Sequence, residues 1–163
     1  MSYQTIGTSI PSIKQSIDQI LEVTANLSED TIRWNPSEEE WSILQILSHL
    51  TEAIPYWLSE IETVVDAPGS KWGRGLQDPA RLAAVTDTEK LSVEDILKQT
   101  EELKQKVEDG LGKLDEETLS KKSPHRNFDK FGNKSVSYIV DHFIDEHIAG
   151  HYNQIKRNLS KIK

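Results

Sequence analysis

The chain has 163 residues and a mass of 18.5 kDa, which suits one domain with its own hydrophobic core, so we expect residues 1–163 to form a single domain. Its net charge of -8 and scattered basic residues disfavour nucleic acid as a partner, and the absence of cysteine excludes disulfides, thiolate zinc sites and a cysteine nucleophile. No apolar run reaches the roughly 18 residues of a membrane span and the first residues lack the layout of a signal peptide, which predicts a cytoplasmic protein without a membrane partner.

Apolar residues recur at spacings of three and four in the first third of the chain, which predicts two amphipathic helices there. The first covers about residues 9–27. Ser37 and Glu40 have the spacing of a capping box, so we expect the second helix to begin near Glu38. His49 lies on the shoulder of the apolar stripe of this second helix and should face, or nearly face, the core.

Residues 66–91 interrupt the helical pattern with three glycines and two prolines. A loop of this length is more often functional than idle, and it could act as a lid over a site. A third helix is predicted from Ser92 to Gly110 or Gly112, and a last helix from about Ser135. With no alternating strand pattern, the four helices predict an all-α four-helix bundle with a long loop between the second and third helices.

His147 and His151 stand four residues apart on the apolar stripe of the last helix. This spacing places both imidazoles on one face about one turn apart, where two rings can share a metal ion. Buried neutral imidazoles need hydrogen bonds or a metal, so simple packing of core histidines is the alternative. With His49, three imidazoles would leave coordination positions open for water or substrate, which is typical of catalytic sites. Ile148 follows His147, so the HExxH motif of metalloproteases is missing and peptidase activity is disfavoured.

Other polar residues near this pair are predicted to lie outside the metal site. His142 precedes His147 by five residues, a rotation of about 140° on a regular helix, which predicts a surface or interface histidine. Asp145 and Glu146 point to other faces of the helix, outside the ligand set. His125 falls in a polar, locally basic segment and is predicted to lie in a solvated loop.

Two stretches of this sequence, in this order, resemble the DinB superfamily of four-helix, metal-binding bacterial proteins. They are WNPSEEEWSILQILSHL at residues 34–50 and HIAGHYNQI at residues 147–155, and the resemblance spans nearly the whole chain. It implies a divalent metal ion bound by three histidines, with a glutamine beside them. The matching positions here are His49, His147, His151 and Gln154.

The resemblance implies a metal-dependent enzyme that acts on a small molecule, because characterised relatives include thiol S-transferases, a thiol-dependent isomerase and a hydrolase. The leading hypothesis is a transferase that joins a low-molecular-weight thiol, its cosubstrate, to a small electrophile. The alternatives are a metal-dependent hydrolase of a small electrophile and a non-enzymatic protein that binds a metal or ligand. Three imidazoles and water suit Zn, Ni, Fe or Mn, so the sequence leaves the metal open.

The candidate substrate pocket is formed by Gln154, Arg74 and Trp57. Gln154 stays on the inner side of the last helix, three residues past His151, where its amide could orient a ligand or a water. Trp57, with Trp41 or Trp72, could wall the pocket, and Arg74 or Arg81 could hold a substrate carboxylate by paired hydrogen bonds. A homodimer is compatible with the resemblance, although a single sequence gives no direct evidence of an interface.

Overall fold

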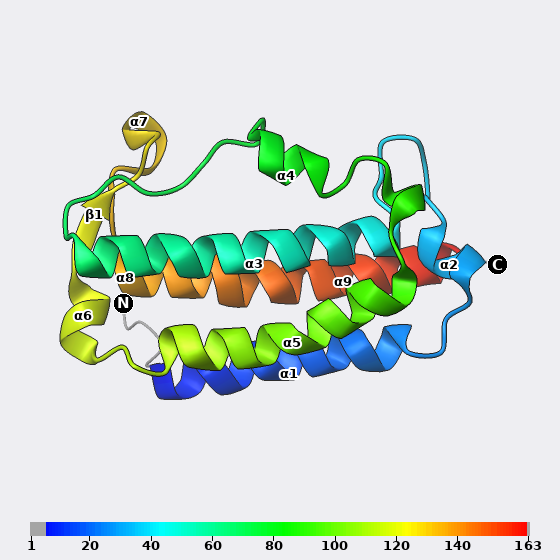
Figure 1. The fold of residues 1–163 in the computed structure, drawn as a ribbon, viewed down its shortest axis with the longest axis horizontal. Helices are drawn as coiled ribbons and strands as arrows, with labels where there is room; N and C mark the ends of the chain where they lie inside the picture. Colours follow the sequence, from blue (N-terminus) through cyan, green and yellow to red (C-terminus); the bar gives the residue numbers. More distant parts are fainter. Residues whose placement is uncertain (1–5, 163) are drawn as a thin grey trace.

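The computed structural model describes residues 6–162, and these residues form an all-α four-helix bundle (Figure 1), which confirms the predicted fold class. Two of its long helices, α3 and α9, lie side by side, and α1 and α5 lie side by side beneath them. Their bounds are α1 Ile6–Thr24, α3 Ile43–Asp66, α5 Val93–Leu111, and a last helix made of α8 Val136–Tyr138, η2 Ile139–Asp145 and α9 Glu146–Lys161. None of the described helices combines the length and apolar character needed to cross a membrane.

The connection between α3 and α5 explains the long loop predicted from the sequence. The two helices are neighbours and run in the same direction, so the chain must return along the bundle before α5 can begin (Figure 1). A helix of 24 residues such as α3 is about 36 Å long. Residues 67–92, here called the strap, cover this distance and include α4 (Pro79–Ala83) and the short turn η1 (Thr88–Lys90).

The second long helix begins later than predicted. Ser42 is its N-cap: its hydroxyl accepts from the Gln45 amide, and the Gln45 side chain accepts from the Ser42 amide, which makes a complete capping box. Ser37 instead closes a turn by accepting from the amides of Glu39 and Glu40. The prediction was wrong because the capping pattern occurs twice. Buried apolar residues follow directly only after Ser42, so the helix begins there.

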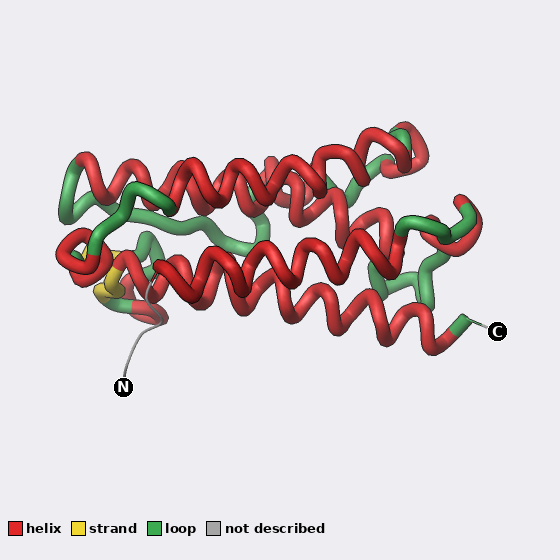
Figure 2. Tube along the Cα trace, turned by 90° about the horizontal axis from the view of Figure 1, so that it is seen from below, coloured by secondary structure: helices red, strands yellow, loops and turns green. Residues whose placement is uncertain are grey.

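Short elements lie at the two ends of the bundle (Figure 1). α2 (Glu29–Arg33) lies at the end where α3 begins, and at the opposite end α6 (Glu116–Ser120) precedes strands β1 (Lys122–Pro124) and β2 (Asn133–Ser135), which pair antiparallel around α7 (Phe128–Phe131). Figure 2 shows this small ribbon at one end of the helices. Residues 122–135, here called the hairpin, also join the strap, since the Trp72 amide donates to the Pro124 carbonyl and the Arg126 amide donates to the Trp72 carbonyl.

Candidate metal centre

Three histidines converge where α3 packs against α9. His49 comes from α3, and His147 and His151 come from α9. One ring nitrogen from each lies within 4.8 Å of the others, and the Nε2 atoms of His49 and His147 are 3.0 Å apart. The structure therefore brings together the three residues that the sequence picked out as ligands.

Hydrogen bonds fix the proton on two of these rings. The Nδ1 atom of His147 lies 3.1 Å from the carbonyl oxygen of Phe143, and Nδ1 of His151 lies 2.7 Å from Oε1 of Gln154. Both oxygens only accept hydrogen bonds, so each Nδ1 carries the proton and each Nε2 keeps a lone pair. An imidazole with its Nδ1–H held in this way presents Nε2 to a metal.

His49 completes a donor set that fits a divalent cation. Its side chain is 3% exposed, and within the described part of the chain its Nδ1 atom is buried without a hydrogen-bond partner. Its Nε2 faces the lone pair of His147 Nε2 at 3.0 Å, a contact that is repulsive unless a proton or a cation lies between them. Two nitrogens that each stand about 2.0–2.1 Å from one ion are themselves roughly 3 Å apart.

The three rings are neutral at pH 7, which is the form that binds metal. Burial lowers the pKa of His49 to about 2, and the nearby rings of His147 and His151 act in the same direction. Burial also lowers the pKa of His147 to about 4. The pKa of His151 is lowered by burial too, against the opposing effect of its hydrogen bond to Gln154.

The last helix is not regular ahead of the histidine pair. Residues 139–145 form a π-helical turn, in which the Glu146 amide bonds the carbonyl of Asp141. The assumption of a regular helix for His142 was therefore wrong, because a π turn takes in more residues than an α turn. His142 nevertheless stays outside the cluster: its side chain is 48% exposed and stacks on Tyr138, at the rim of the cavity described below.

The two carboxylates beside the cluster are not among its ligands, in line with the prediction. Asp145 is buried but faces α1, where the hydroxyl of Ser12 donates to it at 2.9 Å. Burial raises the pKa of Asp145 above its usual value. Glu146 is largely exposed, with 67% of its side chain accessible, and lies at the edge of the cavity.

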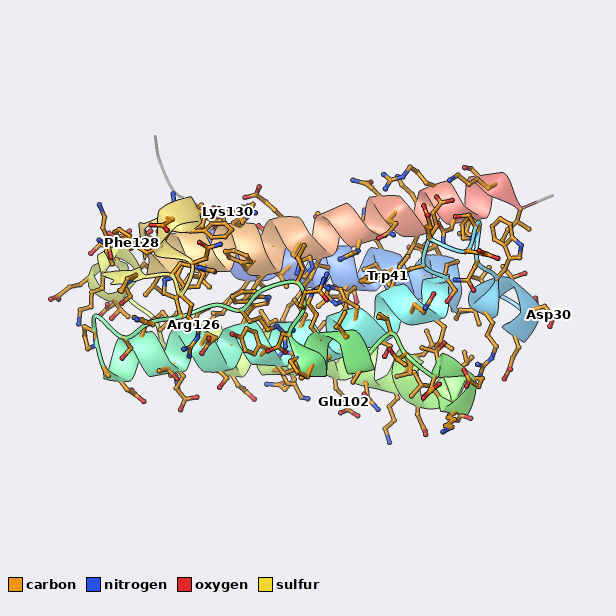
Figure 3. All side chains as sticks on the ribbon, turned by 90° about the horizontal axis from the view of Figure 1, so that it is seen from above. Asp30, Trp41, Glu102, Arg126, Phe128 and Lys130 are labelled. Atoms are coloured by element: carbon orange, nitrogen blue, oxygen red, sulfur yellow. The ribbon has the colours of Figure 1, made fainter. Side chains whose placement is uncertain are left out.

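A cavity of about 510 Å³ adjoins the three histidines. Its walls come from α3, the strap, the hairpin and the last helix. Trp57 and Phe143, stacked at 4.3 Å, form an apolar wall together with Ala53 and Phe131. Figure 3 looks onto the face of the bundle that carries the strap, with Trp41 and Lys130 far apart along the helices.

The three residues predicted for the pocket, Gln154, Arg74 and Trp57, all line this cavity. Arg74 is already engaged, because its guanidinium pairs with both carboxylate oxygens of Glu52 and with Asp78. It also lies 4.0 Å from the ring centre of Tyr56, and its side chain is only 7% exposed. Arg74 therefore ties the strap to α3.

The other two candidate tryptophans lie beside the cavity rather than along it. The Trp41 ring is 5.1 Å from that of His49 and stacks on His151 at 6.2 Å, and Asn158 donates to the Trp41 carbonyl at 2.9 Å. Trp72 is fully buried, with its indole N–H on the carbonyl of Ser123. Trp41 therefore packs against the rings of His49 and His151, whereas Trp72 connects the strap to the hairpin.

His125 is a cavity residue that the sequence reasoning missed. It was predicted in a solvated loop, but it is 3% exposed, packs against Trp72 and Phe131, and lines the cavity. Its Nδ1 accepts from the Asn127 amide at 2.8 Å, so its proton sits on Nε2, and burial lowers its pKa. The signal in the sequence was weak: aromatic residues such as Phe131 interrupt an otherwise polar segment.

Gly73 is required for the position of His125. It has a φ of +91°, and a Cβ atom there would lie 2.2 Å from Nε2 of His125. Gly69 has a φ of +90° but nothing within 4 Å of an added Cβ. A side chain at Gly69 would therefore strain the backbone, as at Gly73, but would clash with no neighbour.

We expect Gly69→Ala to lower the free energy of unfolding by about 1 kcal/mol and Gly73→Ala by about 2–4 kcal/mol, measured by urea denaturation. Equal losses in the two variants would contradict the close contact with His125.

Comparisons with known proteins agree with this architecture. A sequence model of the DinB superfamily matches residues 12–155. No curated protein sequence matches this chain. Among solved structures, YfiT from Bacillus subtilis matches with a TM-score of 0.77 over 98% of this chain and 90% of that chain, at 11% sequence identity. That protein is described as a probable metal-dependent hydrolase with an unusual four-helix bundle topology. At this identity the likeness shows a shared fold.

Proposed function

Because the chain belongs to the DinB superfamily, we propose that it is a metal-dependent enzyme that transfers a low-molecular-weight thiol to a small electrophile. His49, His147 and His151 would hold the divalent cation. The observation that carries the proposal is their convergence beside a cavity of about 510 Å³, where one ring nitrogen of each histidine lies within 4.8 Å of the others. Packed core histidines, the alternative, would share a hydrogen bond between the Nε2 atoms of His49 and His147, with the proton on one of them.

A divalent cation at this centre supplies Lewis acidity, which lowers the pKa of a thiol or a water bound beside it. A thiol needs less help than water, since its ordinary pKa is about 8.5, against about 15.7 for water. Among the described residues that line the cavity, Glu146 is the only carboxylate, and it is largely exposed. The shortage of buried general bases thus favours a thiol as the nucleophile over water.

The chain's own residues orient and shield the reacting groups. Gln154 and the Phe143 carbonyl hold the rings of His151 and His147, so the ligand nitrogens stay directed at one point. The stacked pair of Trp57 and Phe143 provides an apolar surface for the electrophile and excludes water from that side. The neutral ring of His125 carries its proton on Nε2. It can therefore donate a hydrogen bond, but it cannot act as a general base through that nitrogen.

A metal-dependent hydrolase is the second candidate. The observation that favours it is the fold shared with YfiT, itself described as a probable metal-dependent hydrolase. In this chain Glu146 would then have to act as the general base, because it is the carboxylate at the edge of the cavity.

Two assays, thiol conjugation and ester hydrolysis, separate these candidates. Protein stripped of metal and protein reloaded with Zn, Ni, Fe or Mn is incubated with a chlorodinitrobenzene and each of several thiols, including glutathione, cysteine and coenzyme A. The transferase proposal expects thioether formation that requires both metal and thiol. Ester hydrolysis by the loaded protein without any thiol would favour the hydrolase, and inactivity in both assays would favour a non-enzymatic metal- or ligand-binding role.

A further inference from the structure

Arg81 lies beside the three histidines, and within residues 6–162 most of its guanidinium donors have no partner. Its guanidinium carbon is 5.9 Å from the ring centre of Trp41, the same ring that packs against His49 and His151. Among the described residues, the guanidinium donates one hydrogen bond, to the Leu76 carbonyl at 3.1 Å. An arginine side chain carries five N–H donors, so four remain for a ligand in the cavity that Arg81 lines.

Of the two arginines that line the cavity in the described part of the chain, Arg81 has more guanidinium N–H donors available for a ligand. Arg74 spends its donors on Glu52 and Asp78. Among the residues that the structure describes, no carboxylate lies within 4.0 Å of the Arg81 guanidinium. Asp78, the N-cap of α4, accepts from the backbone amide of Arg81 at 3.2 Å and makes no ion pair with its guanidinium.

The charges around the cavity favour an anion although the chain as a whole is acidic. Arg81 and Lys130 line it as cations without a carboxylate partner among the described residues, while the Arg74 charge is compensated. Against them stands Glu146, which is exposed and screened by solvent. In a chain of net charge -8, this cavity is a local positive site beside apolar walls.

We propose that Arg81 is the substrate-binding residue that selects ligands carrying a carboxylate, whose apolar body lies along Trp57 and Phe143. The proposal deepens the proposed function and rests on it for the role of the site. Arginine binds a carboxylate through paired, charge-assisted hydrogen bonds, which gives direction as well as affinity. The carboxylate belongs either to the thiol or to the electrophile.

The test uses metal-free protein, so that a carboxylate cannot bind through the metal. Phenylacetate, 3-phenylpropionate and 4-phenylbutyrate, which differ in reach, are titrated calorimetrically against their neutral amides. A parallel arm compares 3-mercaptopropionate with 3-mercaptopropanol. We expect the preferred acid to bind about tenfold more tightly than its neutral counterpart in the wild type. Arg81→Gln should lose this preference and Arg81→Lys should keep part of it, whereas Arg157→Gln, the same charge change at an exposed site on α9, should keep all of it.

Each outcome of the titrations supports or overturns the proposed role of Arg81. An Arg81-dependent preference among the phenyl acids places the carboxylate on the electrophile, and one confined to the mercapto acid places it on the thiol. Equal binding of acids and neutral compounds, a preference that survives in Arg81→Gln, or binding of none of them at millimolar concentration overturns the proposal. Metal uptake is measured separately on the same wild-type protein. Uptake without an Arg81-dependent preference refutes this inference alone, and the preference without uptake refutes the metal-dependent function alone.

Discussion

Replacing His147 with alanine is expected to abolish metal retention in protein purified without a histidine tag. The change removes one of the three proposed ligand nitrogens, so that only the imidazoles of His49 and His151 would remain to hold the ion. Loss of a partner that only orients a ligand weakens metal binding by roughly 10–100-fold, and loss of a ligand itself costs more. Metal content by mass spectrometry and affinity by competition with a chelator would measure both effects.

Two further variants make this experiment a graded series. Gln154→Leu removes the acceptor of the His151 Nδ1–H but no ligand, so it should weaken metal affinity by about 10–100-fold. His142→Ala removes an exposed histidine of the same helix and should leave affinity unchanged. The proposed centre would be refuted by equal metal content in wild type and His147→Ala, or by loss of metal in His142→Ala.

Metal-free protein is expected to lose stability as the pH falls below about 6.5. Burial keeps the pKa of His49 at about 2 and that of His147 at about 4, whereas in the unfolded chain both should titrate near 6.5. Between these values the unfolded state binds more protons than the folded state, so the free energy of unfolding decreases as the pH decreases. Each ring contributes at most about 1.4 kcal/mol per pH unit, and we expect a total loss of roughly 2–4 kcal/mol between pH 7 and pH 5.

Urea denaturation at several pH values checks this prediction. His49→Phe replaces one buried imidazole with an apolar ring and should flatten the profile between pH 7 and pH 5. His142→Phe changes an exposed ring and should leave the slope as in the wild type. Identical slopes in wild type and His49→Phe would show that the buried rings are not the source of the pH dependence. Adding metal should steepen the profile, because protons and the cation compete for the same nitrogens.

The grouping of the three histidines was predictable because it depends on spacing along helices. His147 and His151 are one turn apart, and a helix places residues four apart on the same face whatever surrounds it. His49 followed from its place on a stripe that had to be buried. These inferences survived an error about the start of α3, because a shift of the N-terminus does not rotate the residues that follow.

The cavity was not predictable in the same way, because its walls come from segments without helical period. His125 reaches it only because the hairpin pairs with the strap at Trp72. Among the described residues, Arg74 forms an ion pair and Arg81 does not, and this difference depends on Glu52. Glu52 is 22 residues from Arg74 in the chain and pairs with it in the fold. No local pattern distinguishes Arg74 from Arg81, since Glu52, which neutralises Arg74, reaches it only in the folded chain.

By itself, the sequence determined the bundle, the long connection between its second and third helices, and three histidines turned toward the interior. These follow from hydrophobic periodicity and from turn residues, which act over a few positions of the chain. Only the tertiary structure decided that one nitrogen of each ring lies within 4.8 Å of the others and that, among the described residues, Nδ1 of His49 has no hydrogen-bond partner and the Arg81 guanidinium donates only to Leu76. The reason is physical: distances, proton positions and free donors depend on packing between segments up to about a hundred residues apart, as His49 and His147 are.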